Sequence, residues 1–134
     1  MRGLAVISSG LLIAAALAAC GGGSNSNADK YSGEKAKVAT VIDELGKAAR
    51  SGDGRRICDQ LFDANLRISV RRASKHACAQ EVVDKIFDQK TSYDVQSLGL
   101  SGNTANVRVK DQKGRKSLLL LLRESGSWRI ARIS

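Results

Sequence analysis

The strongest constraint on the fold is a change of hydrophobic periodicity at Thr91. Before this residue, apolar side chains recur with the 3.6-residue period of helices, and after it they alternate with the two-residue period of strands. The strand-like part divides into four segments with a glycine in each intervening turn, which is typical of an antiparallel meander. This order predicts an α+β fold, with three N-terminal helices packed on a curved four-stranded antiparallel sheet. The expected strands span residues 91–100, 104–110, 115–123 and 128–133.

The third strand-like segment contains five consecutive leucines, Leu118 to Leu122. A run that is apolar on both faces is typical of a central strand that is covered on both sides. The helices can cover only one of these faces. We therefore expect a homodimer to cover the other.

The helical part divides at two places. Residues 32–50 and 54–66 predict the first two helices, because Ser51-Gly52-Asp53-Gly54 between them can end one helix and cap the next. Residues 67–72 alternate apolar and basic side chains, which predicts a short connection compatible with a brief strand. The third helix is expected over residues 74–89, with Ser74 as its cap.

The first 19 residues have the order of a secretory signal: a positive start at Arg2, an apolar run and two small alanines. The apolar run is too short for a comfortable membrane span. The end of the segment, Leu17-Ala18-Ala19-Cys20, resembles the bacterial lipobox at all four positions. This resemblance implies cleavage before Cys20, lipidation (including palmitate-like acyl chains) at that residue, and a location on the extracytoplasmic face of the cell membrane. The alternatives are an uncleaved N-terminal helix and a secreted protein with an idle cysteine.

The domain boundaries follow from this order. Residues 1–19 are the expected signal peptide, residues 20–31 the acylated cysteine with a flexible tether, and residues 32–134 the folded domain. The tether is predicted because Gly21 to Ala28 is rich in glycine, serine and asparagine and has no reason to fold.

Two cysteines remain for the folded domain, Cys58 and Cys78, each on the apolar face of a predicted helix. Disulfides persist outside the cytoplasm, so a single bridge between the two is predicted. The alternative is a pair of buried free thiols. A redox-catalytic role is not predicted, because no Cys-x-x-Cys spacing occurs.

Three local features are similar to the nuclear transport factor 2-like superfamily, which includes the ketosteroid isomerase and polyketide cyclase (SnoaL-like) relatives. They are the break from Ala48 to Gly54, the helical pair that holds Cys58 and Cys78, and the closing segment Gly126-Ser127-Trp128-Arg129-Ile130. The resemblance implies a cone-shaped α+β fold with an interior pocket. The hairpin that this superfamily places before its third helix is reduced here to residues 67–72 or missing, a departure that bears on the pocket's size.

Few side chains suit catalysis or metal binding. The enzymes of the superfamily use pocket carboxylates, and Asp94 is the one weak catalytic candidate, because it begins a strand. His76 is the sole histidine, so neither a metal site nor a cofactor is expected. The aromatic residues that could line a pocket, or equally form the core, are Tyr93, Trp128, Phe62 and Phe87.

The formal net charge is +9, and +8 once Arg2 leaves with the signal. On an exported protein such charge favours anionic lipid or a wall polymer over nucleic acid, or it serves solubility alone. We expect a lipid-anchored, non-catalytic domain that binds a small apolar ligand or an envelope partner. The alternatives are an enzyme of the same fold and an envelope protein that acts through its basic surface. The basic residues form two groups: Arg55, Arg56, Arg67, Arg71, Arg72 and Lys75, and Arg108, Lys110, Lys113, Arg115 and Lys116.

Overall fold

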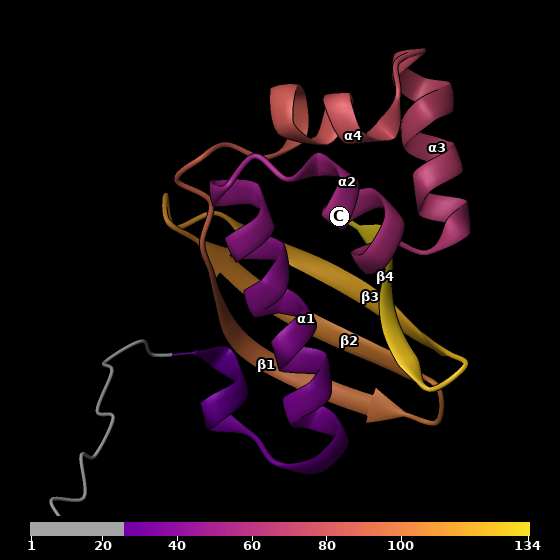
Figure 1. The fold of residues 1–134 in the computed structure, drawn as a ribbon. Helices are drawn as coiled ribbons and strands as arrows, with labels where there is room; N and C mark the ends of the chain where they lie inside the picture. The colour runs from indigo at the N-terminus through magenta and orange to yellow at the C-terminus, as the bar shows by residue number, and fades with distance from the viewer. Residues whose placement is uncertain (1–25) are drawn as a thin grey trace, which may run out of the picture.

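The computed structural model describes residues 26–134, so the predicted signal and Cys20 lie outside the described range. A helical half precedes four strands (Figure 1). No helix in the described part is long and apolar enough to span a membrane. The helical elements are η1 (Asn27–Lys30), α1 (Gly33–Arg50), α2 (Gly54–Arg56), η2 (Ile57–Leu61), α3 (Ala64–Ser74), α4 (Cys78–Glu81) and η3 (Val82–Ile86), and the strands are β1 (Tyr93–Ser101), β2 (Thr104–Asp111), β3 (Lys116–Glu124) and β4 (Ser127–Ile133).

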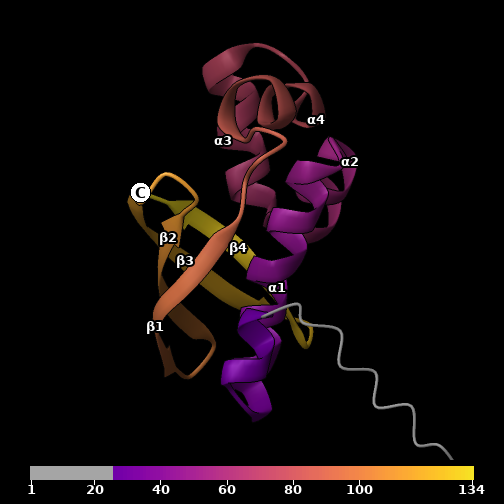
Figure 2. The same cartoon turned by 90° about the vertical axis from the view of Figure 1, so that its left-hand side faces the viewer.

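The sheet confirms the predicted α+β class. Its strands are antiparallel in the order β1-β2-β3-β4, as a meander requires. The helix α1 packs across one face of the sheet, and α3 and α4 gather at one end of the molecule (Figures 1 and 2). The strand β1 begins two residues later than predicted. Thr91 instead forms a turn with Asp88, in which the Thr91 N–H donates to the Asp88 carbonyl and the Thr91 hydroxyl accepts from the Asp88 N–H.

The region between the first helix and the sheet differs from the prediction. Residues 67–72 are part of a helix, α3, rather than a connection or a brief strand. Asp63 starts this helix by accepting a hydrogen bond from the Leu66 N–H at 2.7 Å. The helix ends at Ser74, because the next residue, Lys75, adopts a left-handed conformation with a φ of 60°. Ser74 donates to the Val70 carbonyl and so closes α3 instead of capping the next helix.

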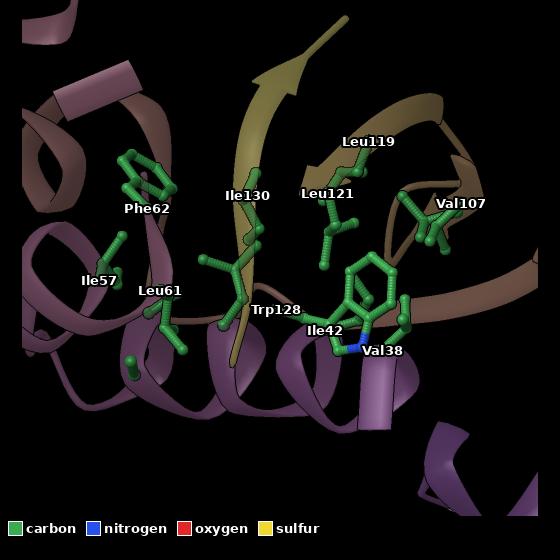
Figure 3. Close-up of a cluster of buried hydrophobic side chains, with 14 of the residues drawn as sticks. Val38, Ile42, Ile57, Leu61, Phe62, Val107, Leu119, Leu121, Trp128 and Ile130 are labelled. Carbon is green, nitrogen blue, oxygen red and sulfur yellow. The ribbon is translucent and has the colours of Figure 1, made fainter. Parts of the chain in front are cut away.

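The core lies between α1 and the inner face of the sheet. Side chains from the apolar stripe of α1 meet alternate residues of β2, β3 and β4 (Figure 3). Burying each such aliphatic side chain stabilises the fold by about 1.5–3 kcal/mol. The contributing residues include Val38, Ile42, Leu45, Val107, Leu119, Leu121, Trp128 and Ile130.

The leucine run of β3 is covered unequally on its two faces. Leu119 and Leu121 are fully buried, whereas Leu118, Leu120 and Leu122 are half-buried on the outer face. The strand is central, as predicted. The outer leucines are paired across the strands with arginines, whose aliphatic stems can cover them. These pairs are Leu118 with Arg108, Leu122 with Arg129 and Leu120 with Arg132.

The end of the segment predicted as a tether is folded, and its earlier residues lie outside the described range. Residues 27–30 form the 3₁₀ helix η1, and Asn27 is 4% exposed, although both lie in the segment expected to be flexible. The reason is hydrogen bonding rather than apolar burial, because Asn27 binds Asp43 of α1 and the backbone of β1.

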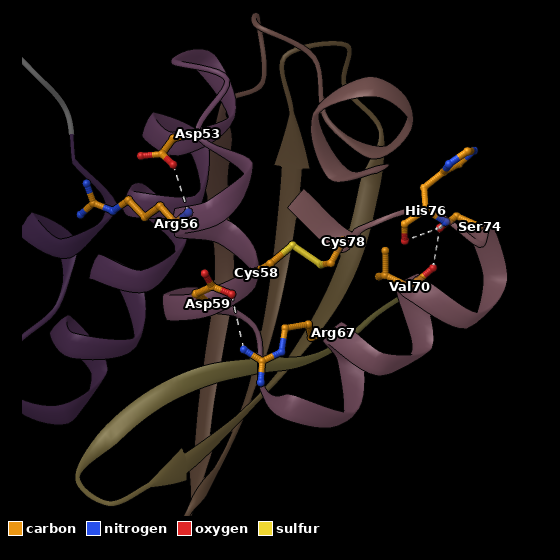
Figure 4. The surroundings of a disulfide bond; sticks show 9 residues. All are labelled: Asp53, Arg56, Cys58, Asp59, Arg67, Val70, Ser74, His76 and Cys78. Atoms are coloured by element: carbon orange, nitrogen blue, oxygen red, sulfur yellow. Dashed lines mark hydrogen bonds and ion pairs between the residues drawn. A yellow bond between two sulfur atoms is a disulfide. The ribbon is translucent and has the colours of Figure 1, made fainter. Parts of the chain in front are cut away.

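The predicted disulfide is present between Cys58 of η2 and Cys78 of α4, with their Cα atoms 6.1 Å apart. It joins two short helical pieces that are separated by α3 in the sequence (Figure 4). The bridge therefore holds the helical end of the molecule as one unit.

Candidate functional site

The space between α1 and the sheet is filled by side chains. Trp128 is 5% exposed, and its ring lies among Val38, Ile42 and Leu121 (Figure 3). Phe62 and Phe87 are also buried, with ring centroids 6.5 Å apart in a tilted arrangement. Three of the four aromatic residues proposed from the sequence as pocket residues thus pack in the core.

Tyr93, the fourth aromatic candidate, is half-buried at the start of β1. It borders a surface hollow of about 470 Å³ beside Asp43 and Arg50. Burial, and secondarily the nearby Asp111 carboxylate, raise the pKa of Tyr93 to about 12. Its hydroxyl is therefore protonated at neutral pH and can act only as a neutral donor or acceptor.

A polar cluster closes the core beside Trp128. The indole N–H of Trp128 donates to Glu34 Oε2 at 2.9 Å. Lys37 donates to the same carboxylate at 2.7 Å, and Arg123 lies 3.4 Å from it and 5.9 Å from the Trp128 ring centroid. Hydrogen bonds from Lys37 and then Trp128 lower the pKa of Glu34 to about 2. This carboxylate is a fixed anion and cannot work as a general acid at neutral pH.

Asp94, the weak catalytic candidate, lies at the surface rather than in a cavity. Its side chain is 54% exposed and is paired with Lys30 of η1. Gln96 also donates to it. The hydrogen bond from Lys30 lowers the pKa of Asp94 below its ordinary value. A carboxylate that acts as a general base in an apolar pocket needs the opposite environment, in which burial raises the pKa.

The remaining polar candidates have structural partners. Asp63 is a buried carboxylate, but it caps α3 through the Leu66 N–H. His76 is exposed next to the end of α3, where its N–H donates to the Ser74 hydroxyl at 3.2 Å. Within residues 26–134, no group of three or more His, Cys, Asp or Glu side chains is placed to hold a metal ion.

Three residues of the first basic group line a groove at the helical end of the molecule, whereas Arg72 and Lys75 do not border it. This hollow of about 460 Å³, which we call the arginine groove, lies beside the disulfide between η2, α3 and α4 (Figure 4). Arg67 and Arg71 reach it from α3, and Arg55 reaches it from α2. Arg56, predicted in the same group, instead pairs with Glu44 of α1.

The charge in the arginine groove is only partly compensated. Arg67 lies 3.5 Å from the Asp59 carboxylate, which also borders the groove. Among residues 26–134, Arg55 and Arg71 form no ion pair. Three guanidinium groups therefore face one carboxylate in a cleft with room for a ligand group.

The second basic group lies apart from the groove, on the outer face and at one turn of the sheet. Arg108 and Lys116 border a shallow hollow of about 380 Å³ together with Leu118. Arg115 is held at the turn by Asp111, with Nε 2.7 Å from the carboxylate. The sequence separated the two groups along the chain, but spacing alone does not show which face of the fold each side chain occupies.

Among known proteins, solved structures resemble this chain in fold. No family model matches the chain, and no curated protein matches it. A solved structure named Rd1NTF2_05, with five substitutions, is 21% identical, with a TM-score of 0.51 over 76% of this chain and 98% of that one. The fold is nuclear transport factor 2-like. An NTF-2 like protein of unknown function from Silicibacter pomeroyi DSS-3 is 19% identical, with a TM-score of 0.49 over 74% of this chain and 94% of its own.

This likeness confirms the α+β fold that the break at Gly54 and the closing Trp128 strand implied. At this identity the likeness establishes the fold alone, since one fold hosts many unrelated activities. What the chain does must therefore be argued from its own surface and interior.

Proposed function

We propose that this protein is a lipid-anchored, extracytoplasmic binding domain without a catalytic centre. It binds an envelope partner through its basic surface rather than a small apolar ligand in its interior. The observation that carries this choice is the packing of Trp128 against Val38, Ile42 and Leu121, which occupies the interior of the cone. A ligand site there would require these side chains to leave a close-packed core, at a cost of several kcal/mol.

The anchor is proposed from the lipobox at Cys20. Two or more acyl chains on this residue hold a protein stably on a bilayer, whereas a single chain binds only marginally. From Cys20 to Ser26, where the described chain begins, an extended chain spans at most about 20 Å. Because Asn27 is already bound to the domain, the folded part stays close to the lipid head groups.

The non-catalytic assignment is supported by the surroundings of the carboxylates. Asp94 is exposed and ion-paired, Glu34 is held as an anion, and Asp63 serves as a helix cap. Asp94 and Glu34 have lowered pKa values rather than the raised pKa that a general acid or base in an apolar pocket needs, and Asp63 is occupied by the backbone of α3.

The test combines fractionation with mass spectrometry of the full chain, expressed in a bacterial host that exports and lipidates proteins. We expect the wild-type protein in the membrane fraction, with a mature N-terminus at Cys20 that carries the mass of a diacylglyceryl group. Cys20→Ala should remove this mass, while Ser24→Ala, in the same segment, should leave it unchanged. An unmodified wild-type Cys20 would overturn the anchor, and a stoichiometric apolar adduct in native mass spectra would overturn surface binding.

A further inference from the structure

We propose that the arginine groove is the docking site for an anionic polymer of the cell envelope, with Arg55, Arg67 and Arg71 binding its phosphate or carboxylate groups. This inference deepens the proposed function and rests on it, because the anchor decides which way the groove faces. It specifies an anionic polymer as the partner and the α3–α4 end of the domain as its binding site.

The guanidinium groups have the geometry that such a partner requires. Arginine presents a rigid fork of donors that matches carboxylate and phosphate oxygens in pairs. Asp59 neutralises part of the charge near Arg67, but Arg55 and Arg71 have no carboxylate partner within the described residues. A polyanion that enters the groove would supply the missing counter-charge and release its own condensed counterions.

The helix α3 is exposed to an unusual degree. Helices in proteins are stabilised mainly by burying an apolar face, yet no residue of α3 is fully buried. Ile68 is 39% exposed and lines the groove between Arg67 and Arg71. No acidic side chain occurs anywhere in the helix. The surface of α3 is therefore cationic with one apolar contact point, which suits a polymer with a charged and partly apolar repeat.

The groove is held in shape before any ligand binds. The Cys58–Cys78 disulfide borders it and joins η2 to α4. Gly54 allows the backbone of Ala79 to approach α2 so closely that a Cβ on Gly54 would lie 1.9 Å from the Ala79 carbonyl oxygen. A rigid groove loses less conformational entropy on binding than a flexible one. Three separate guanidinium groups can therefore bind a polymer selectively.

The position of the groove favours a polymer over lipid head groups. In both views the α3–α4 end lies opposite η1, where the described chain begins (Figures 1 and 2). Between the two ends runs α1, whose 18 residues span about 27 Å. An anchor at Cys20 attaches the domain at its η1 end, so the groove lies at the end farther from the point of attachment, on the side more accessible to the wall.

The experiment measures polymer binding by the full chain, purified in non-ionic detergent from an exporting host. Fluorescein-labelled inorganic polyphosphate and labelled poly-glutamate are the probes, titrated at several salt concentrations by fluorescence anisotropy. The groove variant is Arg55→Gln, Arg67→Gln and Arg71→Gln together. The matched control removes the same charge from the sheet, with Arg108→Gln, Lys110→Gln and Lys116→Gln.

We expect the groove variant to raise the Kd for at least one polymer tenfold or more. The slope of log K against log salt should become shallower by about two, since each lost contact removes about 0.7. The control should change the Kd less than twofold. Circular dichroism and the thermal midpoint check that the variants are folded. If the triple variant unfolds, the single variant Arg71→Gln takes its place, because it breaks no ion pair within the described residues. We expect this single variant to raise the Kd about threefold.

Four results would overturn the inference. Equal losses in the groove variant and the sheet control would show that net charge alone binds the polymer. Unchanged affinity in a folded groove variant, or no binding of either polymer by the wild-type chain, would remove the site. Groove-dependent binding to vesicles with 30% phosphatidylglycerol that is tighter than binding to either polymer would assign the groove to lipid. Membrane fractionation of Cys20→Ala tests the lipid anchor independently of the groove. The proposed function can therefore hold even if the groove does not bind a polymer.

Discussion

Asn27 lies against Asp43, and both its backbone N–H and its side-chain amide donate to Oδ1 of that carboxylate, at 3.0 and 2.7 Å. The same amide donates to the Tyr93 carbonyl, and its oxygen accepts from the Val95 N–H at 2.9 Å. One side chain thus joins α1 to the edge strand β1. This edge would otherwise present unpaired backbone groups.

Replacing Asn27 with alanine should therefore destabilise the domain. The change leaves buried groups of Tyr93 and Val95 without partners, which costs about 1–3 kcal/mol. Denaturant unfolding measures this loss, and hydrogen exchange at the Val95 amide should accelerate with it. Asn65→Ala, at an exposed position of α3, is the control and should change stability by less than about 0.5 kcal/mol. Equal stability of the two variants would contradict the bridging role of Asn27.

Gly54→Ala should be among the most damaging single substitutions in this chain. Its new Cβ would meet the Ala79 carbonyl oxygen at 1.9 Å, a backbone atom that cannot move without displacing α4. We expect a loss of about 3 kcal/mol or more, at the upper end of overpacking effects. Gly99→Ala is the matched control, because no atom lies within 4 Å of its Cβ. Differential scanning calorimetry that gives both variants the same thermal midpoint would refute the close contact.

Removing the disulfide should lower the free energy of unfolding by about 3 kcal/mol, because the bridge closes a loop between cysteines 20 positions apart. The double variant Cys58→Ala and Cys78→Ala tests this by chemical denaturation. A reductant should lower the thermal midpoint of the wild-type chain and leave that of the double variant unchanged. If the reductant shifts both midpoints equally, the effect does not come from this bridge.

The Glu34 cluster predicts a dependence of stability on pH. The folded-state pKa of Glu34, about 2, lies below its ordinary value of 4.5 because Lys37 and Trp128 donate to the ionised form. Its contribution is therefore fully present above pH 4.5 and is lost as the pH falls toward 2. Glu34→Gln should be less stable than wild type at pH 7, and the difference should shrink at pH 3. Urea unfolding followed by Trp128 fluorescence measures both, and a difference that stays constant with pH would contradict this assignment.

The sheet was accessible to sequence reasoning because its signals are local. Alternation along residues 104–110 and a glycine in each turn define neighbouring antiparallel strands without reference to the rest of the chain. Helix α1 was equally clear, since its apolar stripe repeats over five turns. The helical end was harder. Arg67 to Arg71 alternates like a strand, and its helix is set by the Asp63 cap and by the tie of the Asp63 N–H to the Ile130 carbonyl.

In the candidate site, too, the sequence predicted some features and tertiary contacts set the others. The sequence marked an excess of basic residues near Arg55 and Arg67, but spacing could not show that Arg56 turns to Glu44 while Arg55 joins the groove. It marked Trp128 as a pocket or core residue without deciding between them. The buried Asn27 carried no sequence signal, because a polar residue in a glycine- and serine-rich stretch is usually solvated.

The sequence by itself determined the α+β class, the order of the strands, the disulfide partners and the expectation of a lipid anchor. These follow from periodicity, turn residues, cysteine count and a contiguous motif, all of which are properties of neighbours along the chain. Tertiary structure alone decided that Trp128 fills the interior, that Asp94 faces solvent and that Arg55, Arg67 and Arg71 meet in one groove. Each of these depends on side chains brought together from distant segments, whose packing and hydrogen bonds exist only once the helices lie on the sheet.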